Sequence, residues 1–216
     1  WLREQGVTII ANIAGNTPED YCAMAEKLND TDIDMIEMNI SCPNVKQGGV
    51  QFGTSCAGVE DITKAVRAHC KKPLMVKLSP NVTDISEIAL AAESAGADAV
   101  SMINTLTGMR IDINTKRPII HNNTGGFSGP ALLPIAVRMV WQTYQKVKIP
   151  IVGLGGISTW QDAVEMLLAG ATALQIGTVL FTDPYAPIKI AQGLSRYMDE
   201  NGIQGLSELT GGVKPW

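Results

Sequence analysis

Several polar side chains that could take part in catalysis stand at or just after the ends of short apolar runs. Asn12, Asn39 and Asn104 lie at such ends, and Cys42 and Asn44 come a few residues after Asn39. An amide side chain both donates and accepts hydrogen bonds, which suits the imide-like edge of a flavin or a pyrimidine. Singly, each asparagine could be a turn residue, but four on one rim favour a binding site.

One cysteine and one lysine in this set have further chemistry. A thiol of ordinary pKa, about 8.5, is mostly protonated near neutral pH, so Cys42 could act as a base only if it were held at the proton to be removed. The alternative is a buried structural cysteine. Lys77 lies in the apolar run 74–78, where a buried lysine needs a partner. We favour pairing with an electron-rich ring atom of a phosphorylated cofactor over a solvated lysine.

Glycines follow the last two apolar runs. Gly155 and Gly156 follow one run and Gly177 follows the next, each before an expected helix or helical turn. Bare backbone N–H groups at such positions can cradle a phosphate, helped by the helix dipole. One glycine cluster is often only a tight turn, but two in this register favour a phosphate site. Residues 125–130 are also glycine-rich, and no Rossmann fingerprint follows a strand, which disfavours a dinucleotide.

These residues need a scaffold of alternating strands and helices. Apolar runs without polar alternation, typical of strands covered on both faces, are expected at residues 7–13, 35–40, 74–78, 99–103, 149–154 and 173–176. Thr17 predicts a helix start as its cap, with Pro18 at the first helical position. Further helical patterns cover residues 86–95, 132–147 and 161–169.

The alternation predicts an α/β fold, a (β/α)8 TIM barrel with about six βα units present and the first two missing. In such barrels catalytic groups lie where strands end, and a phosphate frequently lies after strands 7 and 8. The alternative is a complete six-stranded open sheet. We expect residues 1–216 to form a single barrel domain, the C-terminal part of the full barrel.

Composition excludes several classes of protein. A net charge of −4 gives no reason to expect a nucleic-acid partner, and no apolar run is long enough to span a membrane. The four cysteines are scattered, with no C-x-x-C pair, and there are two histidines. Neither a disulfide framework nor a metal site is expected, and reduced thiols favour the cytoplasm.

The string Asn-Ile-Ser-Cys-Pro-Asn-Val-Lys at residues 39–46, followed by Gly48-Gly49 and Phe52-Gly53-Thr54, resembles the active-site loop of class 1 dihydroorotate dehydrogenases. The resemblance extends through residues 76–81, 104–105, 125–130, 153–157 and 175–178, and so covers essentially the whole chain. It implies a barrel that binds FMN and oxidises dihydroorotate to orotate in pyrimidine (UMP) biosynthesis. It also implies that the N-terminal strands of the family are missing here.

The resemblance also implies residue roles. Cys42 matches the catalytic base, and Asn39 matches a residue that contacts both FMN and substrate. Asn44, Asn104 and Thr105 match substrate-binding positions. The remaining FMN contacts that it implies are Asn12, Lys77, Ile103, Gly129, Gly155, Gly156, Gly177 and Thr178. The loop 41–54 is expected to close over the substrate. Cys56 is read as an extra, incidental thiol of the loop region that follows the cysteine motif.

The loop 46–53 is similar to that of the 1B subclass. This similarity implies a partner subunit that carries FAD and a 2Fe-2S cluster and passes electrons to NAD, with a homodimer of catalytic subunits inside a heterotetramer. Two alternatives remain open. One is another FMN-dependent barrel oxidoreductase, such as a dihydropyrimidine dehydrogenase, and the other is a non-flavin barrel that binds a phosphorylated metabolite.

Overall fold

The computed structural model describes residues 1–41 and 52–216, and its centre is one curved sheet of parallel strands. The strand order is β1-β2-β3-β4-β9-β10, so β1 and β10 are its edges. The strands are β1 (Ile10–Ile13), β2 (Met35–Asn39), β3 (Leu74–Lys77), β4 (Ala99–Met102), β9 (Ile151–Leu154) and β10 (Ala173–Gln175). All five pairings are parallel, as βα units require.

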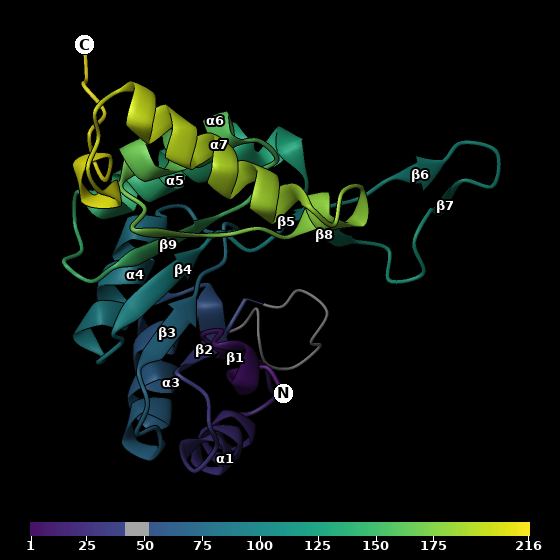
Figure 1. Cartoon of the computed structure of the whole chain (residues 1–216). Helices are drawn as coiled ribbons and strands as arrows, with labels where there is room; N and C mark the ends of the chain where they lie inside the picture. Colours follow the sequence, from purple (N-terminus) through teal and green to yellow (C-terminus); the bar gives the residue numbers. More distant parts are fainter. Residues whose placement is uncertain (42–51) are drawn as a thin grey trace.

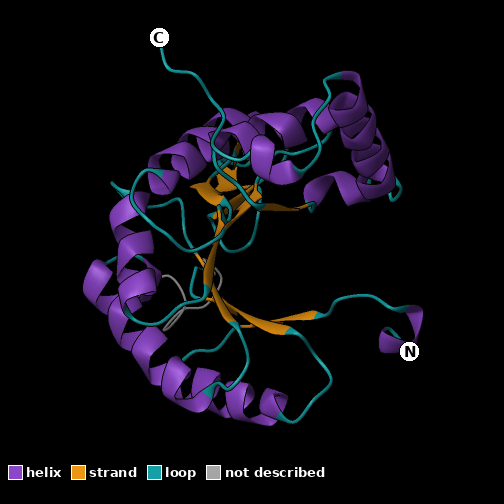
Figure 2. Cartoon of the chain, turned by 60° about the vertical axis from the view of Figure 1, so that its left-hand side comes forward, coloured by secondary structure: helices purple, strands orange, loops and turns teal. Residues whose placement is uncertain are grey.

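Helices cover the outer face of this sheet in chain order. They are α1 (Pro18–Asn29), α3 (Cys56–His69), α4 (Ile85–Ser94), α5 (Leu133–Tyr144), α6 (Trp160–Ala169) and α7 (Ala186–Glu200). Each packs against the next, from α1 on α3 through to α6 on α7. Figure 2 shows the resulting arc of helices around the strands, with an opening between its two ends. No helix among the described residues has the length and apolar character needed to cross a membrane.

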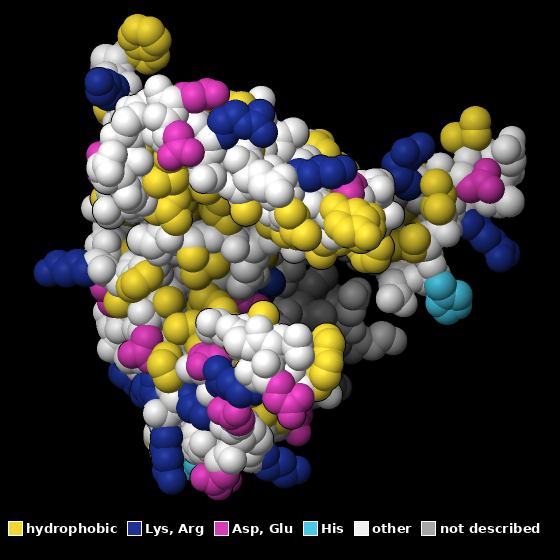
Figure 3. Space-filling model, viewed as in Figure 1, with side chains coloured by type: hydrophobic (Ala, Val, Ile, Leu, Met, Phe, Trp, Pro, Cys, Tyr) yellow, Lys and Arg dark blue, Asp and Glu magenta, His cyan; other side chains and the backbone are white. Residues whose placement is uncertain are grey.

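Two short antiparallel ribbons interrupt the alternation between β4 and α5. β5 (Leu106–Gly108) pairs with β8 (Gly125–Phe127), and β6 (Ile111–Asp112) pairs with β7 (Arg117–Pro118). The β6–β7 ribbon projects from the body of the molecule (Figure 1). The segment 106–127 carries exposed apolar side chains, among them Met109 and Ile113. Figure 3 shows yellow, apolar atoms on the projecting part of the molecule. The sequence did not predict these strands, which are two or three residues long.

The core lies between the sheet and the helices. Ile36, Met38, Val76, Val100 and Ile151 are buried on the strands and belong to one continuous apolar cluster. Strands covered on both faces have no reason to alternate apolar and polar residues, which explains their sequence pattern. The apolar side chains thereby fix the strand ends, where the polar residues stand.

The expected fold is confirmed: the sheet is curled, parallel and covered by helices, as in part of a (β/α)8 barrel. Thr17 caps α1 in a capping box with Asp20, as its pattern predicted. Strand β1 begins at Ile10 rather than at residue 7, and the sequence analysis did not identify α3 or α7. The reading of Cys56 as a loop thiol was wrong, because Cys56 is the first residue of α3 and Ser55 caps that helix.

Candidate functional site

A cavity of about 360 Å³ lies at the carboxyl ends of the strands. Its size is within the usual range for small-molecule sites. The residues that line it come from the last positions of β3, β9 and β10 and from the segments after β4, β8, β9 and β10. They are Lys77, Ile103, Asn104, Thr105, Ser128, Gly129, Leu132, Leu154, Gly155, Gly156, Ile157, Ser158, Gln175, Ile176, Gly177, Thr178 and Val179. Segments far apart in the chain therefore form one polar and apolar wall.

Glycine backbone forms one side of this cavity. Gly156 has φ +84°, and a Cβ there would lie 2.5 Å from the backbone nitrogen of Leu133, so the chain packs too closely for a side chain. A Cβ on Gly177 would meet nothing within 4 Å, so its backbone is open. Gly177 precedes a 3-10 turn at Thr178–Phe181. This wall can offer backbone N–H groups to an anion.

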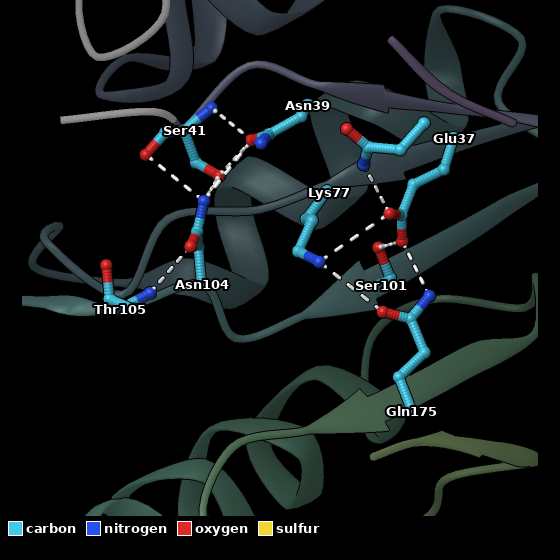
Figure 4. Close-up of polar contacts among 9 residues, drawn as sticks. Glu37, Asn39, Ser41, Lys77, Ser101, Asn104, Thr105 and Gln175 are labelled. Atoms are coloured by element: carbon cyan, nitrogen blue, oxygen red, sulfur yellow. Dashed lines mark hydrogen bonds and ion pairs between the residues drawn. The ribbon is translucent and has the colours of Figure 1, made fainter. Parts of the chain in front are cut away.

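A network of amides and hydroxyls lies at the ends of β2 and β4 (Figure 4). The Asn39 side-chain oxygen accepts from the Ser41 hydroxyl at 2.9 Å and from the Asn104 amide at 3.2 Å. Asn104 also donates to the Ser41 hydroxyl at 2.6 Å and accepts from the Thr105 backbone N–H at 2.8 Å. Buried Tyr21 donates to the Asn39 backbone carbonyl at 2.8 Å. Asn39 is thus fixed from both sides, and its amide oxygen already has protein partners.

A second polar network lies deeper in the curve of the sheet, around Glu37 (Figure 4). One Glu37 oxygen accepts from the Ser101 hydroxyl and from the Gln175 amide, both at 2.7 Å. The other accepts from the Asn12 amide at 2.5 Å and lies 3.5 Å from the Lys77 ammonium. The Lys77 nitrogen lies 3.4 Å from the Gln175 side-chain oxygen. Lys77 therefore has the partners that its apolar surroundings demand.

The charge state of Glu37 depends on these partners. Burial by itself raises the pKa of the carboxyl group. The positive charge of Lys77 and the hydrogen bonds from Ser101, Gln175 and Asn12 outweigh burial, and they hold the pKa of Glu37 below its ordinary value. Buried Glu37 and partly buried Lys77 thus form a pair of opposite charges next to the cavity.

The structure brings most of the predicted site residues together. Nine of them line the cavity: Lys77, Ile103, Asn104, Thr105, Gly129, Gly155, Gly156, Gly177 and Thr178. Asn12 and Asn39 are not among its lining residues, although Asn39 bonds to Asn104 and Asn12 bonds to Glu37. Cys42 and Asn44 lie outside the described residues.

Sequence reasoning missed Glu37, Ser101 and Gln175. Glu37 had a usable signal, because it is a charged residue inside the apolar run 35–40, the same argument that singled out Lys77. Ser101 carried no such signal, since a small hydroxyl inside a strand attracts no particular interpretation. Gln175 lies in the segment 175–178 that carries the family resemblance, but the resemblance implied no role for it.

Comparisons with known proteins relate this chain to one family. The sequence profile described as dihydroorotate dehydrogenase matches residues 1–198. The dihydroorotate dehydrogenase B (NAD(+)) catalytic subunit of Alkaliphilus oremlandii is 54% identical over 211 residues, which are 98% of this chain and 70% of that protein. The subunit of the same name from Bacteroides thetaiotaomicron is 54% identical over 214 residues, 99% of this chain and 71% of that protein.

A solved structure supports the fold. The dihydroorotate dehydrogenase of Eimeria tenella, in complex with ferulenol, has a TM-score of 0.77 and 22% identity to this chain. The match covers 93% of this chain and 60% of that one. At this identity the likeness concerns the fold alone.

Proposed function

This chain belongs to the dihydroorotate dehydrogenase family, and from that premise we propose that its cavity is the FMN-binding part of an enzyme that oxidises dihydroorotate to orotate. The sequence predicted a dihydroorotate dehydrogenase, an oxidoreductase of pyrimidine biosynthesis, and the names of the relatives confirm this function. The observation that carries the proposal for the cavity is the convergence of nine predicted residues on it. We also propose that residues 1–216 form a single barrel domain.

The chemistry of the cavity fits FMN. The open backbone at Gly177 and the turn that follows it offer N–H donors to a phosphate. At Gly156 a side chain would clash with the start of α5, so the wall stays bare there. Lys77, next to the cavity, offers a cation to an electron-rich part of the ring system. Ile103 and Gly129 also line this cavity.

We assign the substrate to the adjacent amide network. The Asn39 and Asn104 amides are held by each other, and the Thr105 backbone N–H donates to Asn104. This rigidity reduces the entropy lost on binding. Asn44, outside the described residues, is assigned to the same task from its place in the sequence motif. Amide groups can match both the donors and the acceptors of a pyrimidine ring.

Cys42 is proposed as the base of the reaction. Oxidation of dihydroorotate removes a proton from C5 and a hydride from C6. FMN, when bound, supplies the acceptor for the hydride. The thiolate of Cys42 takes the proton, and it does so efficiently only when its pKa suits the working pH. Pro43 stiffens the chain directly after it.

The electrons then pass to a partner. The relatives are named catalytic subunits of NAD-linked enzymes, which supports a separate partner subunit. We propose that this partner carries FAD and a 2Fe-2S cluster, and that two catalytic subunits pair inside a heterotetramer. We also propose a cytoplasmic enzyme, because Cys22, Cys56 and Cys70 are free thiols among the described residues, as a reducing compartment would keep them.

The absorption spectrum of the purified full-length protein tests the cofactor. A yellow protein with stoichiometric FMN, bleached by dihydroorotate under anaerobic conditions, is the expected result. Bleaching by dihydrouracil in place of dihydroorotate would favour the dihydropyrimidine dehydrogenase alternative. A colourless protein that takes up no added FMN would refute the proposal.

A second experiment tests the partner. The rate of NAD reduction by dihydroorotate is measured for the isolated catalytic subunit and for the complex obtained by co-expression with the partner subunit. We expect appreciable rates only with the partner present. Equal rates without it would contradict the proposed route for the electrons.

A further inference from the structure

Glu37 is the only buried charged side chain among the described residues. It lies in the middle of β2 and is 4% exposed. Burying a carboxylate is costly unless it is paired and hydrogen-bonded, so a sequence retains one inside a barrel only with extensive compensation. The compensation here is complete, since both oxygens have partners.

The partners of Glu37 come from four other strands. Asn12 belongs to β1, Lys77 to β3, Ser101 to β4 and Gln175 to β10. The register places Asn12 directly beside Glu37 on the neighbouring strand, whereas Gln175 is on the far edge of the sheet. Glu37 thus reaches across the curve of the sheet and connects its two edge strands.

Lys77 connects this buried cluster to the cavity. Its side chain is 16% exposed, and both Lys77 and Gln175 line the cavity wall. An ammonium group has three N–H donors. Two long contacts, to Glu37 at 3.5 Å and to Gln175 at 3.4 Å, leave at least one donor for a group inside the cavity. A ligand in the cavity would therefore contact the Lys77 ammonium group. The position of this group and its electric field both depend on Glu37.

We propose that Glu37 is a positioning residue that holds Lys77 at the cavity wall and offsets its positive charge, and thereby limits how strongly the site favours negative charge on the bound flavin. This inference rests on the proposed function, because it assumes that FMN occupies the cavity. The physical reason is that opposite charges at close range cancel most of their field, while a lone buried cation stabilises any nearby anion.

Sulfite binding measures this field directly. Sulfite adds to oxidised flavins and leaves a negative charge on the ring, so its dissociation constant reports how well the site stabilises that charge. In the FMN-loaded protein, Glu37→Gln keeps the shape of the side chain and removes its charge. We expect the sulfite dissociation constant to fall about tenfold and the two-electron reduction potential to rise by about 30 mV, the shift that corresponds to a tenfold change for a two-electron couple.

Two further variants make the test specific. Glu37→Asp keeps the charge but withdraws it from Lys77, and should lower the sulfite dissociation constant by roughly threefold, as expected for a partly weakened pair. If Glu37→Gln does not fold, Glu37→Asp alone tests whether Glu37 offsets the charge of Lys77. Glu165→Gln is the matched control, because it removes an exposed carboxylate on α6 by the same substitution. We expect it to leave sulfite binding unchanged.

The outcomes separate the two proposals. If the unaltered protein binds no FMN, the proposed function fails and this inference fails with it. If the unaltered protein binds FMN and is bleached by dihydroorotate, but Glu37→Asp and any folded Glu37→Gln bind sulfite as it does, only the inference is overturned. Weaker sulfite binding in the glutamine variant would overturn it as well, because the sign of the charge effect would be wrong.

Discussion

Replacing Gly156 by alanine measures how much the shape of the cavity depends on a bare backbone. Gly156 has φ +84°, where an L-residue other than glycine costs about 1–2 kcal/mol. The added Cβ would also lie 2.5 Å from the backbone nitrogen and 2.8 Å from the Cα of Leu133. Backbone cannot move aside as a flexible side chain can, and such overpacking costs about 1–3 kcal/mol. The expected loss of stability is therefore about 2–5 kcal/mol, the sum of these two costs.

Gly202 provides a matched control for this experiment. It has φ +68°, but an added Cβ would meet nothing within 4 Å. Gly202→Ala should therefore cost only the conformational part, about 1–2 kcal/mol. The difference between the two variants isolates the contact with Leu133, at the first residue of α5.

Thermal unfolding without added FMN is the assay, because bound ligand would add its own stabilisation. At this chain length, 1 kcal/mol lowers Tm by about 2–4 °C. Gly156→Ala should thus unfold roughly 2–12 °C below Gly202→Ala, the range given by the overpacking cost. It should also retain less FMN, since the wall moves with α5. Equal Tm values for the two variants would refute the packing argument.

Other substitutions test the proposed base, the hydrogen bond that holds Asn39, and the loss of stability at low pH. Cys42→Ala should slow bleaching of the flavin by dihydroorotate about 10²–10⁴-fold in stopped-flow measurements, which is the usual contribution of a positioned base. The control variant Cys56→Ala should be bleached at the normal rate. Near-normal bleaching of Cys42→Ala would refute the assignment of Cys42 as the base. Tyr21→Phe loses the hydrogen bond to the Asn39 carbonyl and should lower the free energy of unfolding in urea by about 0.5–1.5 kcal/mol, and an unchanged value would show that this bond contributes nothing. The backbone N–H of Ile9 and the Arg3 guanidinium hold the pKa of Asp34 below its ordinary value, so its contribution to stability is present above the unfolded pKa and is lost as pH falls through the folded one. Between about pH 5 and pH 2, the Tm of Asp34→Asn should therefore fall less than the Tm of the unaltered protein. Identical plots of Tm against pH for the two proteins would contradict this assignment.

The sequence determined the strands and several helix starts through local chemistry. Six apolar runs without alternation indicated buried parallel strands, and all six exist, each one to three residues shorter than its run. Thr17 and Pro18 indicated the start of α1 because capping involves residues only three apart. The projecting ribbons escaped prediction, since strands of two or three residues leave no periodic pattern to recognise.

The same local reasoning identified much of the site. Polar residues and glycines at strand ends were expected to meet, and seven of them line one cavity, because parallel strands all end on the same side of a barrel. For Cys42 and Asn44, which lie outside the described residues, the roles rest on the sequence motif.

Only the tertiary structure revealed the partners of Glu37. Its hydrogen-bonding and charged partners are 25 to 138 residues away in the chain and lie on four other strands. No spacing in the sequence encodes these contacts, because they arise when the register of neighbouring strands and the curvature of the sheet turn their side chains toward a common interior. Local patterns decide which residues lie on a strand or at its end. The curvature of the sheet decides which of these side chains come close enough to form hydrogen bonds and ion pairs.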